Sequence, residues 1–328
     1  MSVRENTTAT PENILLEVKD LKKYFPITRG VFQRHVGDVK AVDGVSFDIQ
    51  AGETFALLGE SGCGKSMTAL ALLRLLPQPG GQITGGSVKL DGEELMALPE
   101  TGMRSVRGGR IAMIFQEPMT SLNPVMTVGA QIEESLQQHQ GLRGAAARQR
   151  VVELLDAVGI PDAARRYGEY PHQLSGGMKQ RVMIAIALAG DPDLLIADEP
   201  TSMLDVSIRM NILTLLTQLK TDRRLAMIMI THDLASARHI ADRIVVLFRG
   251  MVVEDGPADR VVEEPAHPYT RALLDALPTR KKRGQRLYSI PGSVPHPAYK
   301  PAGCPFHPRC PYRQSGCEVE WGTLPGML

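Results

Sequence analysis

The chain has 328 residues, of which 43% are hydrophobic and 22% are charged, the composition of a soluble globular protein. Its 37 Lys and Arg residues against 36 Asp and Glu residues give no support to a nucleic-acid-binding surface. The polar start (MSVRENTTATPE) predicts no signal peptide, and apolar runs such as 182–189 fall far short of the roughly 18 residues that span a bilayer, so we expect a cytosolic protein.

The first part of the chain alternates short apolar runs with turn residues. In residues 13–58 the runs ILLEV, AVDGVSFDI and TFALL predict strands, separated by turns at Asp43–Gly44 and Ala51–Gly52. Residues 65–76 (KSMTALALLRLL) are apolar on every side and end at a proline, so we expect a buried helix there. More strand-like runs, including RIAMIFQ, follow in residues 83–115.

The character of the sequence changes twice further along. Residues 125–190 are rich in Ala, Gln, Glu and Leu, which predicts a mostly helical stretch. Strands return in DLLIAD, RLAMIMITHD and RIVVLFRG, with a helix-like segment at 206–220 between the first two. This alternation predicts a largely parallel, covered sheet that a helical insertion interrupts. After residue 257 we expect one short helix in PAHPYTRALLDALP and then a proline-rich tail.

The tail carries a basic run and a group of cysteines. The run 280–283 (RKKR) indicates a solvated linker, with contact to nucleic acid or lipid as the alternative. Three of the four cysteines, Cys304, Cys310 and Cys317, are separated by five and six residues. Disulfides are unfavourable in a cytosolic chain, which leaves metal ligands or reduced thiols as the two interpretations.

Residues 59–66 read GESGCGKS and match the pattern G-x-x-x-x-G-K-[ST] between the TFALL strand and the helix that follows. Gly59 and Gly64 allow the backbone to wrap a phosphate chain with its N–H groups pointing inward. Lys65 then places a charge on the β- and γ-phosphates, and the Ser66 hydroxyl can ligate Mg²⁺. A glycine-rich turn before a core helix is the alternative, which these flanks disfavour. The candidate nucleotide-binding residues are Gly59, Glu60, Ser61, Gly62, Cys63, Gly64, Lys65, Ser66 and Met67.

An apolar strand with an acidic end follows in LLIADE, residues 194–199. Asp198 is expected to hold the Mg²⁺ through water. Glu199 lies one residue beyond, where it could polarise the water that attacks the γ-phosphate. Two surface acids after a buried strand are the alternative, and the presence of a phosphate loop favours the catalytic interpretation.

The stretch LSGGM (174–178) places two glycines where a helix begins, and Ser175 is the expected N-cap. Bare N–H groups at a helix N-terminus attract anions. A phosphate loop, an S-G-G helix start and an acidic strand end, in this order along the chain, resemble the ATP-binding cassette ATPases. In that family the signature of one subunit caps the γ-phosphate held by another. The resemblance therefore implies that the partner's ATP is contacted by Leu174, Ser175, Gly176, Gly177 and Met178, the last in place of the commoner glutamine.

The resemblance covers residues 13–256 and implies the catalytic residues. Gln116, after RIAMIF, resembles the glutamine that senses Mg²⁺ and the attacking water. His232, in MIMITHD, resembles the switch histidine that contacts the γ-phosphate and orients Glu199. The implied catalytic set is Glu199, His232 and Gln116, and the implied Mg²⁺ ligands are Ser66, Gln116 and Asp198.

Two more positions and the fold follow from the same resemblance. Asp205, in SMLD, resembles the loop aspartate that crosses the dimer interface. Phe25, in LKKYFP, resembles the aromatic residue that stacks on adenine, with Tyr24 as the competing choice. The implied fold is an α/β P-loop NTPase cassette with a mostly parallel core sheet, a small antiparallel β part and a helical signature subdomain. The expected division is a disordered N-terminus (1–12), the cassette (13–256, with the helical subdomain at about 117–190) and a C-terminal extension (257–328).

Four local stretches narrow the resemblance: EPMTSLNP, YPHQLSGGM, HPYTRALLDALP and CPFHPRCPY look like the ATP-binding subunits of the peptide/nickel importers. This implies an ATPase that drives uptake of dipeptides, oligopeptides, nickel or related solutes. Its implied partners are a second cassette subunit, favoured as a sister chain, two transmembrane permease subunits, which the segment after Gln116 would touch, and indirectly an extracytoplasmic substrate-binding protein. No nucleic acid is implied, and the chain would lie peripherally on the cytoplasmic face of the inner membrane.

Some members of that family bind a [4Fe–4S] cluster through four cysteines in the tail. Cys304, Cys310 and Cys317 supply three ligands here, and His307 is a candidate for completing a site. Reduced structural thiols are the alternative interpretation.

Three rival functions are less consistent with the sequence. Soluble cassette ATPases of DNA repair or translation usually carry a second cassette, zinc modules or long coiled coils, and none is visible here. A regulatory cassette without catalysis would need a broken Glu199 or His232, and both are intact. An exporter ATPase is disfavoured by the importer-like tail.

Overall fold

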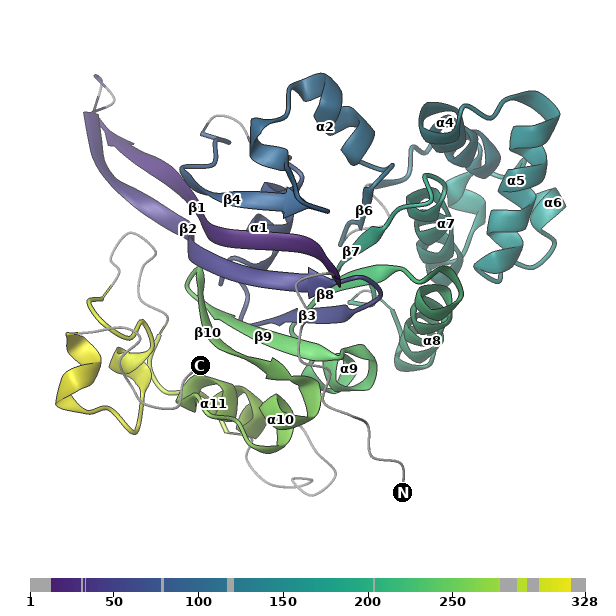
Figure 1. The fold of residues 1–328 in the computed structure, drawn as a ribbon. Coiled ribbons are helices and arrows are strands. Elements are labelled where there is room, and N and C mark those ends of the chain that lie inside the picture. The colour runs from purple at the N-terminus through teal and green to yellow at the C-terminus, as the bar shows by residue number, and fades with distance from the viewer. Residues whose placement is uncertain are drawn as a thin grey trace.

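The computed structural model describes residues 13–319, with gaps at 31, 33, 78–79, 117–120, 203, 278–287 and 294–300 (Figure 1). The predicted disordered N-terminus and the basic run 280–283 lie outside the described residues, as do the first four residues of EPMTSLNP. No helix within the described ranges is both long and apolar enough to cross a bilayer.

A six-stranded sheet in the order β10-β9-β3-β8-β7-β6 forms the centre of the molecule. Five strands run parallel to one another, namely β9, β3, β8, β7 and β6, and β10 is antiparallel at one edge. Every residue of β3, β7 and β8 is buried, as expected for a parallel sheet that is covered on both faces. The predicted parallel core is therefore confirmed. Its strands are β3 (Thr54–Leu58), β6 (Ile111–Ile114), β7 (Leu194–Asp198), β8 (Ala226–Thr231), β9 (Arg243–Phe248) and β10 (Met251–Pro257).

A second, antiparallel sheet has the order β2-β1-β4-β5. The predicted turn at Asp43–Gly44 is wrong, because both residues lie inside β2. Gly44 has a φ of +81°, and the pairing of β2 with β1 shifts register on both sides of Leu21. The turn-forming residues therefore form a β-bulge, and the pairing of the two strands continues beyond it. The turn at Ala51–Gly52 is confirmed. The strands are β1 (Ile14–Arg29), β2 (Arg34–Gln50), β4 (Gly85–Leu90) and β5 (Glu93–Glu94).

Two short helices differ from the expectation. Helix α1 (Lys65–Leu72) ends four residues before the predicted end, since Arg74 takes a left-handed φ of +52° and turns the chain away. Helix α2 (Glu100–Val106) lies in a stretch for which the sequence predicts strands. Its seven residues are too few to give a clear helical period.

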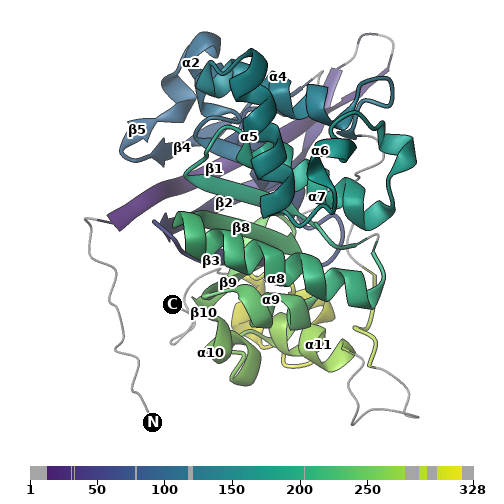
Figure 2. The same ribbon diagram turned by 90° about the vertical axis from the view of Figure 1, so that its right-hand side faces the viewer.

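The predicted helical stretch at 125–190 is confirmed. It forms a separate lobe beside the β6 edge of the sheet, and α8 lies across the sheet next to it (Figures 1 and 2). The predicted helix at 206–220 is α8, which extends to Arg223. The helices of this part are α4 (Val128–Gln140), α5 (Gly144–Ala157), α6 (Ala163–Arg166), α7 (Gly176–Leu188), α8 (Val206–Arg223) and α9 (Leu234–Ile240).

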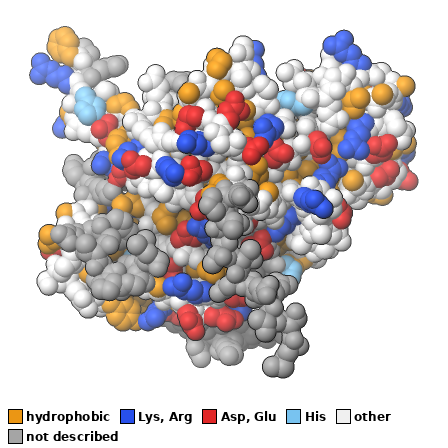
Figure 3. Space-filling model, viewed as in Figure 1, with side chains coloured by type: hydrophobic (Ala, Val, Ile, Leu, Met, Phe, Trp, Pro, Cys, Tyr) orange, Lys and Arg blue, Asp and Glu red, His pale blue; other side chains and the backbone are white. Residues whose placement is uncertain are grey.

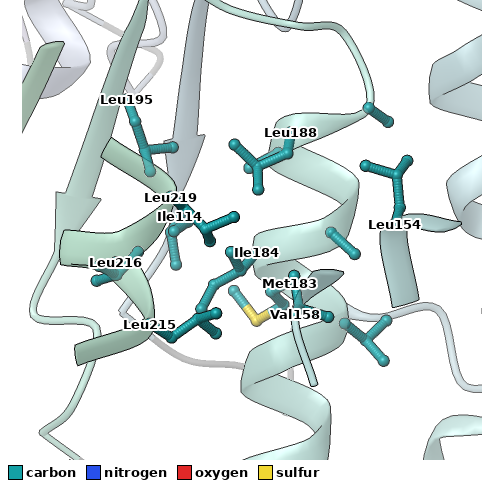
Figure 4. Close-up of a cluster of buried hydrophobic side chains, with 14 of the residues drawn as sticks. Ile114, Leu154, Val158, Met183, Ile184, Leu188, Leu195, Leu215, Leu216 and Leu219 are labelled. Atoms are coloured by element: carbon teal, nitrogen blue, oxygen red, sulfur yellow. The ribbon is translucent and has the colours of Figure 1, made fainter. Parts of the chain in front are cut away.

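An apolar cluster fixes this lobe to the sheet. Figure 4 shows Met183, Ile184 and Leu188 of α7 directed toward side chains of the sheet and of α8. Their neighbours include Leu195 of β7 and Leu216 of α8, and all five side chains are at least 95% buried. Because the cluster holds α7 on the sheet, it also sets where the helix begins, which is the position of LSGGM.

The residues after the central sheet pack against its β9 end. Phe248 of β9 contacts Tyr269 of α11 and Phe306 of the tail, with ring centroids 4.6 and 5.4 Å apart. Tyr269 and Phe306 also contact each other, at 5.3 Å, and all three rings are buried. The predicted short helix between prolines is confirmed as α11. This part contains α10 (Ala258–Glu263) and α11 (Pro268–Ala276), and the 3-10 turns of the described chain are 95–97, 171–173, 307–309 and 315–318.

Candidate nucleotide-binding site

The loop 59–66 joins β3 to α1, in the context that the sequence predicts. Gly59 and Gly64 have φ values of +150° and +107°, in the region that favours glycine. A Cβ atom on Gly59 would lie 2.3 Å from the Leu247 carbonyl oxygen, and one on Gly64 would lie 2.4 Å from that of Ala41. The backbones of β9 and β2 therefore leave no room for a side chain at either glycine.

This close approach yields a prediction. Gly64→Ala should weaken ADP binding by at least about tenfold, because the new Cβ cannot coexist with the Ala41 carbonyl and the loop must move. Calorimetric titration of the purified chain with ADP would measure the effect. Gly62→Ala is the matched control: its φ of +77° costs about 1 kcal/mol, yet no atom lies within 4 Å of the new Cβ. Equal affinities in the two variants would contradict the steric argument.

Lys65 is the first residue of α1 and only 6% exposed. Its ammonium donates to the carbonyl oxygens of Gly59 (2.8 Å) and Glu60 (3.1 Å), so the loop itself holds the charge inside. Burial raises the pKa of the Cys63 thiol, which therefore stays neutral at physiological pH, consistent with a packing role. The arrangement keeps a single cation at the centre of a loop of backbone N–H groups, the chemistry that a phosphate chain requires.

Asp198 ends β7 and is 5% exposed. Burial raises the pKa of its carboxyl above the ordinary value, and a hydrogen bond with Ser66 opposes that rise. Its Oδ1 atom is buried without a hydrogen-bond partner among the described residues. A buried carboxylate oxygen without a hydrogen-bond partner is an unsatisfied acceptor, which a cation beside Ser66 would satisfy. The residues present therefore fit a Mg²⁺ ion.

Three neighbouring strands bring the candidate catalytic residues together. Gln116 follows β6, Glu199 follows β7 and His232 follows β8. The carboxylate of Glu199 accepts a hydrogen bond from Gln116 Nε2 at 3.2 Å through one oxygen. Its other oxygen lies 3.0 Å from His232 Nδ1. The carboxyl ends of parallel strands meet at one edge of a sheet. For this reason Gln116 and His232 converge on Glu199, although they are 83 and 33 positions away from it in the sequence.

The backbone at Glu199 is itself constrained. The residue has a left-handed φ of +45°, which is unusual for a glutamate, and its N–H donates to the Ile230 carbonyl at 2.9 Å. The side chain is 17% exposed, whereas that of His232 is 63% exposed. Glu199 is thus held at both its backbone and its carboxylate, at the boundary between the sheet and the solvent. A carboxylate held in this way is suited to accept a proton from a water molecule.

The signature residues lie at the start of α7. Ser175 caps the helix as predicted, with its Oγ accepting from Met178 N at 3.3 Å. Leu174 and Gly177 are buried, whereas Ser175 and Gly176 are exposed. Ile208 of α8 lies 3.0 Å from where a Cβ on Gly177 would stand, so this glycine also allows α7 and α8 to pack closely. The open face of the helix start is available to a group from another molecule.

The remaining candidates lie apart from this centre. Phe25, in β1, is half-buried beneath the ammonium of Lys23, whose nitrogen lies 4.1 Å from the ring centroid. The competing Tyr24 has its hydroxyl engaged with the carboxylate of Asp43. Asp205 is exposed immediately before α8.

The cysteines of the tail do not form a metal site in this arrangement. Within the described ranges, no three His, Cys, Asp or Glu side chains gather closely enough to hold a metal ion. The thiol of Cys304 instead lies 3.8 Å from His267 Nε2, and burial lowers the pKa of this histidine to about 4. Burial also raises the pKa values of Cys304 and Cys310, so these thiols stay protonated when no metal is bound. The residues do not fit an iron–sulfur cluster.

Two residues at the site were missed by the sequence reasoning. Tyr269 and Arg309 reach Glu60 in the phosphate loop from 209 and 249 positions away. No local sequence pattern predicts these contacts with the phosphate loop, because a buried tyrosine and an arginine in a proline-rich tail are common in proteins.

Comparison with known proteins gives consistent matches along most of the chain. Residues 42–202 match the family described as ABC transporter, and residues 253–317 match the family described as oligopeptide/dipeptide transporter, C-terminal region. A putative peptide import ATP-binding protein of Brucella abortus is 51% identical over 87% of this chain and 86% of its own. The oligopeptide transport ATP-binding proteins AppD of Bacillus subtilis and OppD of Salmonella typhimurium are 48% and 47% identical, over 96% and 97% of this chain and 93% and 92% of theirs.

A solved structure supports the fold independently. The dimeric post-hydrolysis state of the ATP-binding cassette MJ0796, bound to ADP and Pi, superposes with a TM-score of 0.64 at 28% identity. The match covers 74% of this chain and 98% of the cassette.

Proposed function

Because this chain belongs to the ATP-binding proteins of the oligopeptide/dipeptide family of ABC transporters, we propose that it hydrolyses ATP to drive peptide import through separate membrane subunits. The observation that carries the proposal is the carboxylate of Glu199, held between Gln116 and His232 beside the buried Asp198. The similarity of the peptide import proteins, which extends through the tail, favours peptides over nickel as the cargo.

Within one subunit, the proposed chemistry uses residues that follow the carboxyl ends of the central parallel strands, together with Phe25 of the antiparallel sheet. The loop residues Gly59 to Met67 would wrap the phosphates, with Lys65 on the β- and γ-phosphates and Phe25 against the adenine. Mg²⁺, when bound by Ser66, Gln116 and Asp198, would neutralise charge on the phosphate oxygens. Glu199 accepts a proton from the attacking water, and the hydrogen bonds from its two neighbours fix the carboxylate in place.

A second cassette would complete the site. The N-terminus of α7 is exposed at Ser175 and Gly176, and its bare N–H groups suit the γ-phosphate bound to a partner. The dimeric cassette MJ0796 supports such pairing, and a sister chain is the partner favoured here. Asp205 would cross the interface between them. ATP would then favour the closed dimer, and hydrolysis would release it.

The contact with the membrane subunits would use a hollow of about 260 Å³ beside the segment that follows Gln116. It lies between the residues that follow α1, strand β6 and helices α4 and α7, with apolar lining that includes Leu75, Phe115 and Leu122. Leu75 and Phe115 are both exposed and line the same hollow, so one partner helix would cover both side chains. We propose that one of two permease subunits docks here, which would hold the chain at the cytoplasmic face of the membrane and link it to an extracytoplasmic binding protein.

The domain boundaries and the state of the tail cysteines are also proposals. The chain would divide into the cassette at 13–256 and a C-terminal extension from 257, with the helical subdomain at about 117–190. The tail cysteines are proposed as reduced thiols, and no step of the mechanism uses a cluster.

A DNA-repair or translation ATPase is the second candidate function. Figure 3 has basic and acidic side chains interspersed on the face that it displays, and the net charge is only +1, so nothing favours a polyanion there.

The test is an affinity purification of the tagged chain from detergent-solubilised native membranes, with the bound proteins identified by mass spectrometry. Two polytopic permeases and a second cassette are the expected result. Phe115→Asp should reduce permease recovery by about fivefold or more, because it places a charge in the hollow. Phe32→Asp, at the exposed tip of the β1–β2 hairpin, is the matched control. Recovery with ribosomal or repair proteins alone would refute the transport function.

A further inference from the structure

The tail of the chain contacts the phosphate loop directly. Glu60, the second residue of that loop, donates its backbone N–H to the Tyr269 hydroxyl at 2.9 Å. Its carboxylate accepts from Arg309, at 3.0 Å from Nη1 to Oε2 and 3.5 Å from Nη2 to Oε1. Both partners belong to the segment after the central sheet, so a region distant in sequence holds the loop at two points.

The tyrosine is fixed by its surroundings. Tyr269 is fully buried between Phe248 and Phe306. His267, the N-cap of α11, accepts a hydrogen bond from the backbone N–H of Tyr269. Burial raises the pKa of its hydroxyl, which therefore stays protonated and neutral at any physiological pH. The Glu60 N–H is thereby directed toward the C-terminal segment, rather than toward the interior of the loop.

The arginine is equally constrained. The Arg309 side chain is only 6% exposed, and its Nε donates to the Pro291 carbonyl at 3.1 Å, which fixes the plane of the guanidinium. The guanidinium therefore meets the Glu60 carboxylate as a two-point pair at a largely buried position. Such a pair contributes more than the mobile ion pairs of the surface, because its side chains are already ordered.

Glu60 also contacts the core of the phosphate site. Its carbonyl oxygen accepts from Lys65 Nζ at 3.1 Å and from Cys63 N at 3.2 Å. The N–H, the carbonyl and the carboxylate of this one residue thus connect the C-terminal segment to the cation that binds phosphate.

We infer that Tyr269 and Arg309 are positioning residues for nucleotide binding, which fix the conformation of the phosphate loop at Glu60. The inference rests on the proposed function and assigns a role in it to the C-terminal segment. The two side chains order the loop before the nucleotide arrives, so removing either contact raises the entropy lost on binding. Loss of either contact therefore lowers the affinity for nucleotide. The hydrolytic step is preserved, because Glu199 follows β7 and is not bonded to Tyr269 or Arg309.

The experiment is calorimetric titration of the purified full chain with ADP, which binds without hydrolysis. Arg309→Gln is expected to weaken ADP binding about fivefold to tenfold, and Tyr269→Phe about threefold. Arg313→Gln is the matched control: it breaks the ion pair with Glu318 in the same segment without touching the loop, and it should bind as the wild type does. In the assembled transporter, KM for ATP should rise in Arg309→Gln while kcat stays within about twofold.

A double-mutant cycle separates this role from general stability. Glu60→Gln and Arg309→Gln should not add, because each change by itself removes the charge pairing between these two side chains. Wild-type affinity in both Arg309→Gln and Tyr269→Phe, or full additivity in the cycle, would overturn the inference. If Arg309→Gln does not fold, the isosteric Tyr269→Phe decides alone. A wild-type chain that binds no ADP would instead refute the proposed function.

Discussion

Glu199→Gln is expected to lower ATP turnover by the assembled transporter by about 10²- to 10⁴-fold, while affinity for ATP stays within about threefold of the wild type. The amide has the size of the carboxylate but is too weakly basic to accept a proton from water. The hydrogen bond from Gln116 Nε2 can still be accepted by the new carbonyl oxygen, so the local geometry should survive. The loss therefore falls on the chemical step and spares the binding of nucleotide.

Phosphate release at saturating ATP and equilibrium binding of ATP would be measured on the same preparation. Glu153→Gln is the matched control, because Glu153 lies on α5 in an exposed ion pair with Arg150, away from the site. Its turnover should equal that of the wild type. An unimpaired rate in Glu199→Gln would show that another group takes the proton, and the assignment of the base would be wrong.

Lys65→Ala is expected to weaken the binding of ATP and ADP by about 10- to 100-fold. The Lys65 ammonium donates to the carbonyl oxygens of Gly59 and Glu60, and it is the only cationic group within the loop. When nucleotide binds, phosphate oxygens would replace these carbonyls as its partners. Without it, the phosphate chain would be held by backbone N–H groups alone. Because turnover needs bound ATP, hydrolysis at low ATP concentration should fall in parallel.

Titration calorimetry with ADP measures this effect without interference from hydrolysis. Lys19→Ala provides the matched control, since Lys19 is an exposed lysine of β1 paired with Glu17. It should leave the affinity unchanged. Normal ADP binding by Lys65→Ala would contradict the assignment of residues 59–66 as the phosphate loop.

Local features of the sequence predicted much of the fold and the site. The buried strands TFALL, DLLIAD and AMIMIT follow from uninterrupted apolar runs, and the cap at Ser175 follows from a hydroxyl before two glycines. The errors arose where tertiary contacts override local signals. The turn predicted at Asp43–Gly44 became a bulge within a long ladder, and the helix after Lys65 stopped short of its proline.

By itself, the sequence determined the phosphate loop, the acidic strand end, the capped helix start and the alternation that builds a parallel sheet, because each depends on residues close along the chain. Only the tertiary structure decided the strand order that brings Gln116 and His232 to opposite oxygens of Glu199. It also decided that Tyr269 and Arg309 meet Glu60. Such contacts join residues tens to hundreds of positions apart, and their geometry depends on how whole elements pack, which no local pattern encodes.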